Sequence, residues 1–219
     1  MLDMLKIYDR HSIFYIAGSC CYGRPMSTRL AIMDIAAEAV RRRGYNGVSL
    51  DQIARDVGIQ KSSIYYHFSS KSELIAAIFR RFSGQIFSFL EETGQQRRAG
   101  DRLMAYIVET GTFVEEGESI CMSIALNIDR DRLHSEIVDD LLSFHEANIA
   151  WLTETFELGL KDGSIADIGD PVEEANACLA LVDGAQLMAR AHQDSNLYDQ
   201  ATLLLRSRIS PSVPDDAAR

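Results

Sequence analysis

The sequence is poor in proline, in long apolar runs and in paired cysteines. Its 219 residues include four prolines, two of them in the last nine positions, so long stretches contain no helix breaker. No run approaches the roughly 18 apolar residues that cross a bilayer. The four cysteines show no C-x-x-C spacing: Cys20, Cys21, Cys121 and Cys178. These absences predict a cytoplasmic protein with reduced thiols and no membrane partner.

The N-terminal stretch also lacks a convincing targeting signal. Its apolar patch, "IFYIAG", is shorter than the h-region of about 7 to 15 residues in a secretory signal, and acidic residues precede it. We expect residues 1–25 to form a poorly ordered extension, with Met26 as a candidate for the functional start. The polar tail, residues 209–219, is expected to be flexible.

Motifs of the common enzyme classes are missing as well. The sequence contains no H-E-x-x-H, no G-x-x-x-x-G-K-[ST] and no G-x-S-x-G. A di-iron helical enzyme, the alternative from another class, needs two Glu-x-x-His motifs on facing helices. The chain offers only Asp131-x-x-His134, and His145 has Leu142 at the required offset. We therefore predict a protein that is not an enzyme and that uses no cofactor or metal.

Charge is distributed unevenly along the chain. Residues 26–82 hold nine Lys or Arg and five Asp or Glu, whereas residues 83–219 hold ten and twenty-five. The whole chain has a formal net charge of −10. A basic segment attached to an acidic body suggests that this segment alone contacts a polyanion such as nucleic acid.

Apolar positions follow a helical period along almost all of the chain after residue 26. The pattern predicts helices over 27–43, 50–57, about 60–68, 71–92, 99–117, 119–131, 134–163 (as one helix or two), 171–193 and 197–209. No segment alternates polar and apolar residues in the way a half-buried strand does. The sequence therefore predicts an all-α fold.

Two short helices near the start of the chain are joined by a glycine turn. Ser49 and Gln52 fit a capping box, with the serine at the cap and the glutamine three residues later. Gly58 ends this helix after about two turns, and the second helix runs from about Gln60 to Phe68. Two short helices braced by a helix on either side are typical of a helix-turn-helix unit, whose second helix enters a major groove.

The second short helix carries side chains that do not suit a core. Four of them are hydrophilic: Lys61, Ser62, Ser63 and His67. Tyr65 and Tyr66 project about 100° apart, so at least one of them faces outward. Hydroxyls, a lysine, tyrosines and a histidine are chemically suited to phosphate oxygens and base edges. We interpret this helix as a surface that contacts double-stranded DNA.

Residues 27–74 resemble the DNA-binding domain of the TetR/AcrR family of bacterial transcriptional regulators. The resemblance rests on "RRRGYNGVSLDQIARDVGIQKSSIYYHFSSKSEL" at matching spacing. It implies a three-helix helix-turn-helix domain over 26–72 and a helical ligand-binding and dimerisation domain over 73–208. It also implies DNA contacts by Ser49, Lys61, Ser62, Ser63, Tyr65, Tyr66, His67 and Lys71. Gln60 departs from the family, which often has a serine cap there, and Asp51 suits a helix N-terminus better than a groove.

The resemblance further implies a homodimer on a palindromic operator, and repression that an unidentified small molecule relieves. The last two long helices, about 171–192 and 197–208, are then expected to form the dimer seam. Small residues would permit close helix approach there: Ala175, Ala177, Ala180, Gly184, Ala185 and Ala189.

Candidates for an effector pocket are Cys121, Met122, His145 and Trp151, which lie on the helices of the body. Cys121 opens a predicted helix, where the helix dipole lowers the pKa of a thiol, so thiol or redox sensing is an alternative to small-molecule binding. A single cysteine in "SICMSIAL" is also typical of a small core residue.

Overall fold

The computed structural model describes residues 27–211, and every regular element within that range is a helix. This confirms the predicted all-α fold; the predicted extension 1–25 and the tail beyond residue 211 lie outside the described residues. The α-helices are α1 (Thr28–Arg43), α2 (Leu50–Val57), α3 (Lys61–His67), α4 (Lys71–Gly94), α5 (Ala99–Gly111), α6 (Met122–Ile128), α7 (Ser135–Asp162), α8 (Pro171–His192) and α9 (Asn196–Arg206). Two 3₁₀ helices, η3 (Thr112–Gly117) and η4 (Arg130–Arg132), flank α6.

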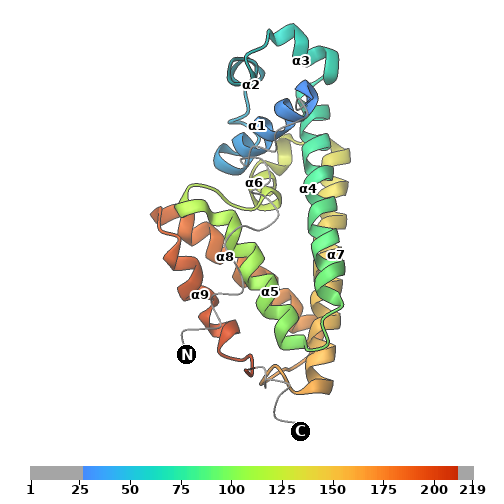
Figure 1. The fold of residues 1–219 in the computed structure, drawn as a ribbon, viewed down its shortest axis with the longest axis vertical. Coiled ribbons are helices and arrows are strands. Elements are labelled where there is room, and N and C mark those ends of the chain that lie inside the picture. Colours follow the sequence, from blue (N-terminus) through green and yellow to red (C-terminus); the bar gives the residue numbers. More distant parts are fainter. Residues whose placement is uncertain (1–26, 212–219) are drawn as a thin grey trace.

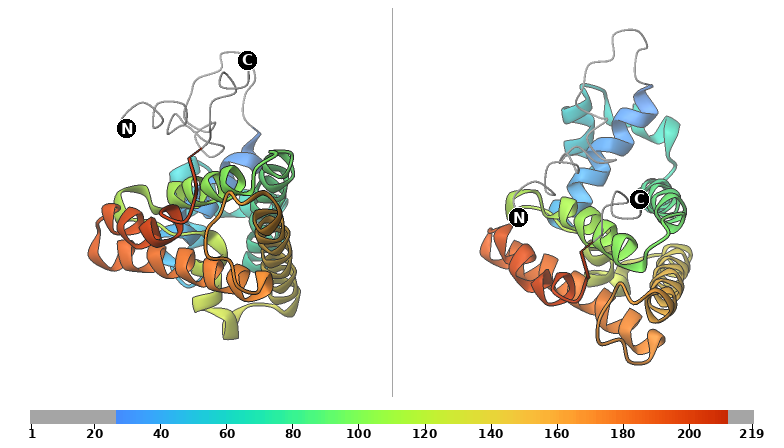
Figure 2. Two further views of the ribbon diagram at one scale, coloured as in Figure 1. Left: turned by 90° about the horizontal axis from the view of Figure 1, so that it is seen from below. Right: turned by 60° about the horizontal axis from the view of Figure 1, so that its bottom comes forward.

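Helices α1, α2 and α3 form a small head at one end of an elongated molecule (Figure 1). The long helix α4 starts in the head and runs down the body, where it packs along α7. Helices α5, α8 and α9 form the other side of the body, with α8 and α9 lying side by side (Figure 2). A movement in the body can therefore reach the head through α4.

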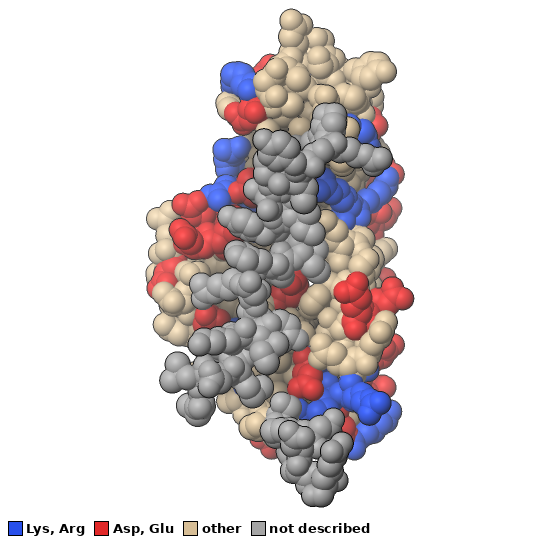
Figure 3. Space-filling view, in the orientation of Figure 1, with Lys and Arg blue, Asp and Glu red and all other residues tan. Residues whose placement is uncertain are grey.

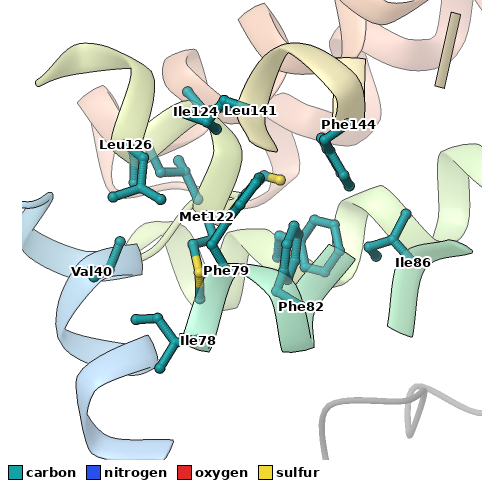
Figure 4. Close-up of a cluster of buried hydrophobic side chains, with 14 of the residues drawn as sticks. Val40, Ile78, Phe79, Phe82, Ile86, Met122, Ile124, Leu126, Leu141 and Phe144 are labelled. Carbon is teal, nitrogen blue, oxygen red and sulfur yellow. The ribbon is translucent and has the colours of Figure 1, made fainter. Parts of the chain in front are cut away.

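Head and body share one hydrophobic core where α1, α4, α6 and α7 meet. Val40 of α1, Ile78 and Phe79 of α4, and Met122 of α6 are all buried there (Figure 4). Helix α4 supplies apolar side chains at a spacing of three or four residues, so one face of it stays against the core from the head into the body. The head is consequently packed onto the body and not tethered by a free linker.

Local capping signals set most helix ends where the sequence predicts them. The Oγ of Ser27 accepts a hydrogen bond from the backbone N–H of Leu30 at 3.3 Å, and Gly44 after α1 has a φ of 68°. Asp170 caps α8, whose first residue is Pro171. Segment 134–163 forms the single helix α7.

The prediction of one helix over 99–117 is wrong. Helix α5 ends at Gly111, and the chain continues as η3 with Glu115 and Glu116 at positive φ values of 36° and 56°. L-residues rarely adopt this left-handed region, so tertiary contacts hold the turn. Those contacts come from Arg41 of α1, which lies 4% exposed beneath η3.

Three of the six small residues expected at a dimer seam face the chain's own core instead. Ala175, Ala185 and Ala189 are buried inside the chain. The same helix exposes Ala177 and Ala180, and open space surrounds Gly184. Helix α8 thus packs one face against the core of its own chain and exposes another face to solvent.

Candidate nucleic-acid interface and internal cavity

The turn between α2 and α3 is built by a serine cap and a left-handed glycine. The Oγ of Ser49 accepts from the N–H of Gln52 at 3.4 Å, which starts α2. Gly58 ends α2 with a φ of 78°, and the N–H of Ile59 then donates to Ala54 O. The reciprocal half of the predicted capping box does not form, because Gln52 Oε1, the atom that would accept from the Ser49 N–H, instead accepts from Arg55 at 2.6 Å.

Helix α3 is anchored by two apolar side chains and presents the rest of its surface outward. Ile64 and Phe68 are fully buried. Tyr65 is 49% exposed and Tyr66 is 87% exposed, with the Tyr66 ring edge-on to His67 at 5.1 Å. The other members of the predicted contact set range from exposed to half-buried: Ser49, Lys61 and Ser62 are exposed, and Ser63, His67 and Lys71 are half-buried.

The two lysines of the predicted set have different environments. Lys61 Nζ lies 2.7 Å from Asp51 Oδ2, and this hydrogen bond raises the pKa of Lys61. Lys71 Nζ sits 4.2 Å from the centre of the Tyr45 ring, and burial lowers its pKa although Asp129 opposes the shift. Lys61 is therefore paired with an exposed carboxylate, whereas Lys71 lies over an aromatic ring.

Two residues of α1 join this surface although the sequence pattern does not single them out. Thr28 lines a hollow with Ser62, Ser63 and Tyr66. The Arg29 guanidinium lies 4.8 Å from the centre of the Phe68 ring, beside the end of α3. On the face drawn in Figure 3, the tip of the molecule is mostly uncharged, and Lys and Arg gather at the level of α1. The surface therefore combines uncharged polar groups at its tip with cations along its flank.

An internal cavity of about 20 Å³ lies in the body. Residues from α4, α5, η3, α6, α7 and α8, and from the turn before α6, contribute to its wall, among them Tyr106, Glu109, Phe113, Cys121, His145 and Asp183. Of the four predicted pocket residues, Cys121 and His145 line it. Met122 lies in the core shown in Figure 4. Trp151 lies one layer outside, stacked on Tyr106 at 5.7 Å with its Nε1 donating to Leu90 O.

The cavity wall is polar at several buried points. Cys121 donates its backbone N–H to Gln186 Oε1 at 2.7 Å, and its Sγ lies 3.1 Å from Ser123 Oγ. Burial, with a smaller effect of Asp183, raises the pKa of the Cys121 thiol to about 11. Burial likewise lowers the pKa of His145, with Arg130 adding to the shift. Among the described residues, no group of three or more His, Cys, Asp or Glu could hold a metal ion.

The end of α1 is fastened to the body by two arginines. The Arg41 guanidinium donates to Phe113 O at 3.0 Å and to Ser119 Oγ at 3.1 Å, and it pairs with Glu115 at 2.8 Å. Arg190 of α8 donates to Arg41 O at 3.0 Å and also to the carbonyl of Arg42. The two arginines both contact the segment of residues 112–121, and this segment contributes Phe113 and Cys121 to the cavity wall.

Comparison with known proteins identifies this arrangement. Residues 32–78, which span most of the head and the start of α4, match the family described as bacterial regulatory proteins, tetR family. A TetR-family regulator from Agrobacterium tumefaciens superposes with a TM-score of 0.79 at 27% identity, over 86% of this chain and 100% of that one. The head thus matches a TetR-family domain, and the whole fold resembles that of solved TetR-family regulators.

Two curated relatives of this chain are named as transcriptional regulators. The repressor NemR of Escherichia coli K12 is 25% identical over 191 residues, which cover 85% of this chain and 96% of NemR. The regulator AcrR of Shigella flexneri is 31% identical over 103 residues, 44% of this chain and 47% of AcrR. The protein is thus a DNA-binding transcriptional regulator, and its relatives are regulators and not enzymes. No helix within residues 27–211 is long and apolar enough to span a membrane.

Proposed function

We propose that this protein is a homodimeric repressor that binds a palindromic operator in the cytoplasm and is released by a small molecule. The main support for this proposal is the outward surface of α3, where Tyr66 is 87% exposed on a helix whose opposite side is fully buried. We assign the DNA contacts to the set predicted from sequence and add Thr28 and Arg29 of α1. In this proposal the head, residues 26–72, binds DNA. Residues 73–208 bind the effector and form the contact with the second subunit.

The first test removes the most exposed ring of α3. Tyr66→Ala should weaken operator binding about tenfold for each half-site, the size expected for one lost hydrogen bond to a charged phosphate. Its melting temperature should stay unchanged, because the ring buries little surface in the free protein. Genomic fragments retained by the purified protein supply the operator, and fluorescence anisotropy measures the affinity.

Leu142→Ala, at a 44% exposed position on α7 of the body, is the matched control for Tyr66→Ala and should bind as wild type. Wild-type affinity of Tyr66→Ala would contradict the assignment of α3 as the contact surface.

Exposed apolar side chains on the last two helices support the dimer. Leu187 and Met188 of α8, and Leu203 and Leu204 of α9, are exposed in the single chain. Apolar patches of this kind mark interaction sites. Ala177, Ala180 and Gly184 extend the patch along α8 with small residues that allow close approach. A second copy of the same two helices, related by a two-fold axis, would bury the patch and pair the heads for two half-sites.

A charge placed in this patch should separate the dimer. Leu204→Asp, at a position 65% exposed, should yield a monomer in light-scattering chromatography at micromolar concentration. Affinity for the full palindrome should fall at least tenfold, while affinity for a single half-site stays the same. Leu160→Asp, a matched change on α7, should leave both the dimer and its DNA affinity intact. A dimeric Leu204→Asp variant with full affinity would place the seam elsewhere.

The thiol alternative receives no support from the surroundings of Cys121. Its side chain is buried, and its pKa of about 11 leaves almost no thiolate at neutral pH. Reactive sensor thiols are instead exposed and have a lowered pKa. Because Cys121 also holds Gln186 through its backbone, we assign it to the wall of the effector cavity.

A further inference from the structure

The two helices at the tip of the head carry no net charge. With His67 counted as neutral, α2 and α3 together hold two acids and two cations: Asp51, Asp56, Arg55 and Lys61. On the face drawn in Figure 3, Lys and Arg gather lower down, at the level of α1. A duplex attracts every cation through its phosphates, whatever its base sequence. The helices proposed to meet base edges therefore add little to this sequence-independent attraction.

One half of this charge balance is a direct contact between the two helices. Lys61 is the first residue of α3, and its Nζ lies 2.7 Å from Oδ2 of Asp51 in the first turn of α2. The two side chains are 45% and 54% exposed, so the pair lies at the surface of the tip. Opposite charges at this separation largely cancel at longer range. Lys61 in the pair therefore attracts phosphates less than a lysine without a partner.

The stability of α2 does not account for this contact. An acid in the first turn of a helix interacts favourably with the helix dipole, but that effect needs no partner on another helix. The cap of α2 is provided by Ser49, whose Oγ accepts from the N–H of Gln52 at 3.4 Å. An exposed ion pair also contributes little to folding. The contact between Asp51 and Lys61 thus has more consequence for what Lys61 can bind than for the fold.

The paired ammonium keeps donors for a further ligand. A lysine ammonium has three N–H donors and no acceptor, and the hydrogen bond to Asp51 uses one of them. Guanine presents two neighbouring acceptors, O6 and N7, on its major-groove edge, and lysine is one of the side chains that contact them. A phosphate contact depends instead on net positive charge. The pair is therefore better suited to a guanine edge than to a phosphate.

We propose that Asp51 is a specificity-determining residue, which holds Lys61 in a charge-balanced pair that contacts a guanine in each operator half-site. DNA without that guanine offers the pair only phosphates, from which it gains little. The inference rests on the proposed function, in which α3 enters the major groove, and deepens it by naming a base. Specificity is a difference between two affinities, so an acid that weakens binding to all other DNA increases it.

Asp51→Asn tests the role of the acid, because it keeps the size of the side chain and leaves Lys61 without a charged partner. Affinity of the full-length dimer for a duplex of random sequence should rise about tenfold, and the slope of log K against log salt should steepen by up to about 2, one phosphate for each head. Operator affinity should change less, so the ratio of operator affinity to random-sequence affinity should fall. Fluorescence anisotropy at a series of salt concentrations measures both. A wild-type slope and ratio in the folded variant would refute the inference.

Two controls separate the ion pair from general repulsion. Asp56→Asn removes an equal charge from the same helix, at an exposed side chain that accepts from Gln52, and should behave as wild type. Asp51→Asn in a Lys61→Ala background should leave the salt slope unchanged, because no ammonium is released. Equal steepening with and without Lys61 would mean that Asp51 only repels DNA, and would overturn the inference. Circular dichroism checks folding, and Asp51→Ser carries the test if Asp51→Asn does not fold.

Selection of bound duplexes from a library with randomised half-sites tests the base. The wild type should enrich a guanine at one position of each half-site, and Lys61→Ala should lose that preference while it keeps the others. A consensus that Lys61→Ala leaves intact at every position would refute the base assignment. Wild-type affinity of Tyr66→Ala would refute the proposed function itself. A weakened Tyr66→Ala together with a wild-type Asp51→Asn would keep the proposed function and refute only this inference.

Discussion

Arg41→Met is expected to lower the free energy of unfolding by about 3 kcal/mol, the usual cost of removing one partner from a buried charged network. Arg41 is 4% exposed, and its guanidinium donates to Phe113 O and Ser119 Oγ while pairing with Glu115. Methionine fills a similar volume but donates nothing, so the buried carbonyl of Phe113 loses a donor. The turn with Glu115 and Glu116 at positive φ loses its buried contact and keeps the pair of Glu115 with the partly exposed Arg42 at 3.2 Å.

The neighbouring arginine provides a matched control. The side chain of Arg42 is 35% exposed and pairs at the surface with Glu38, Glu115 and Glu118. Arg42→Met should therefore cost less than about 1 kcal/mol. Urea unfolding followed by circular dichroism, at one fixed protein concentration because a dimer's stability depends on it, measures both variants. Equal losses at the two positions would show that Arg41 does not act through its buried hydrogen bonds.

Much of the fold could be predicted because its signals are local. A serine cap, an apolar period and a glycine at positive φ lie within a few residues of each other, and they fix α1, α2 and the turn to α3. The end of α5 could not be predicted in this way. Residues 112–117 have an acceptable helical pattern, and a side chain more than 70 positions earlier, Arg41, holds them in another conformation.

The candidate DNA-contact site was likewise predictable from the sequence only where its signals are local. The outward face of α3 follows from its composition, since a lysine and hydroxyls cannot share a core with Ile64. The pairing of Lys61 with Asp51, and the presence of Thr28 beside α3, depend on how helices pack and leave no pattern in the sequence. Small residues in α8 look alike whether they serve the core or a partner, so Ala175, Ala185 and Ala189 were assigned to the wrong face.

The sequence pattern did not single out Glu109 and Asp183, the two acids that line the cavity, because acids on amphipathic helices usually face water. One signal was present in α8. Leu179, Asp183 and Gln186 follow each other at a spacing of four and three residues, which puts the acid on the same face as an apolar neighbour. An acid at such a position is a candidate for a buried carboxylate, and only the packing of α5, α7 and α8 shows that it meets a cavity.

Asp183 should make the protein less stable as the pH rises from 5 to 8. Burial raises the pKa of its carboxyl from the ordinary value of 3.8 to about 7. Between these two values the native state keeps a proton that the unfolded chain has released, so each pH unit lowers the free energy of unfolding by up to about 1.4 kcal/mol. The loss is complete once the pH exceeds the native pKa, and it amounts to about 3 kcal/mol over the interval from pH 5 to pH 8.

Asp183→Asn isolates this contribution from those of His145 and the surface acids, because asparagine does not titrate. The stability of the variant relative to wild type should increase by up to about 3 kcal/mol from pH 5 to pH 8. Urea unfolding at a series of pH values gives the two curves, with Glu157→Gln on α7 as the exposed control that should follow wild type at every pH. Parallel curves for wild type and Asp183→Asn would mean that Asp183 is ionised throughout, in contact with water or with a cation.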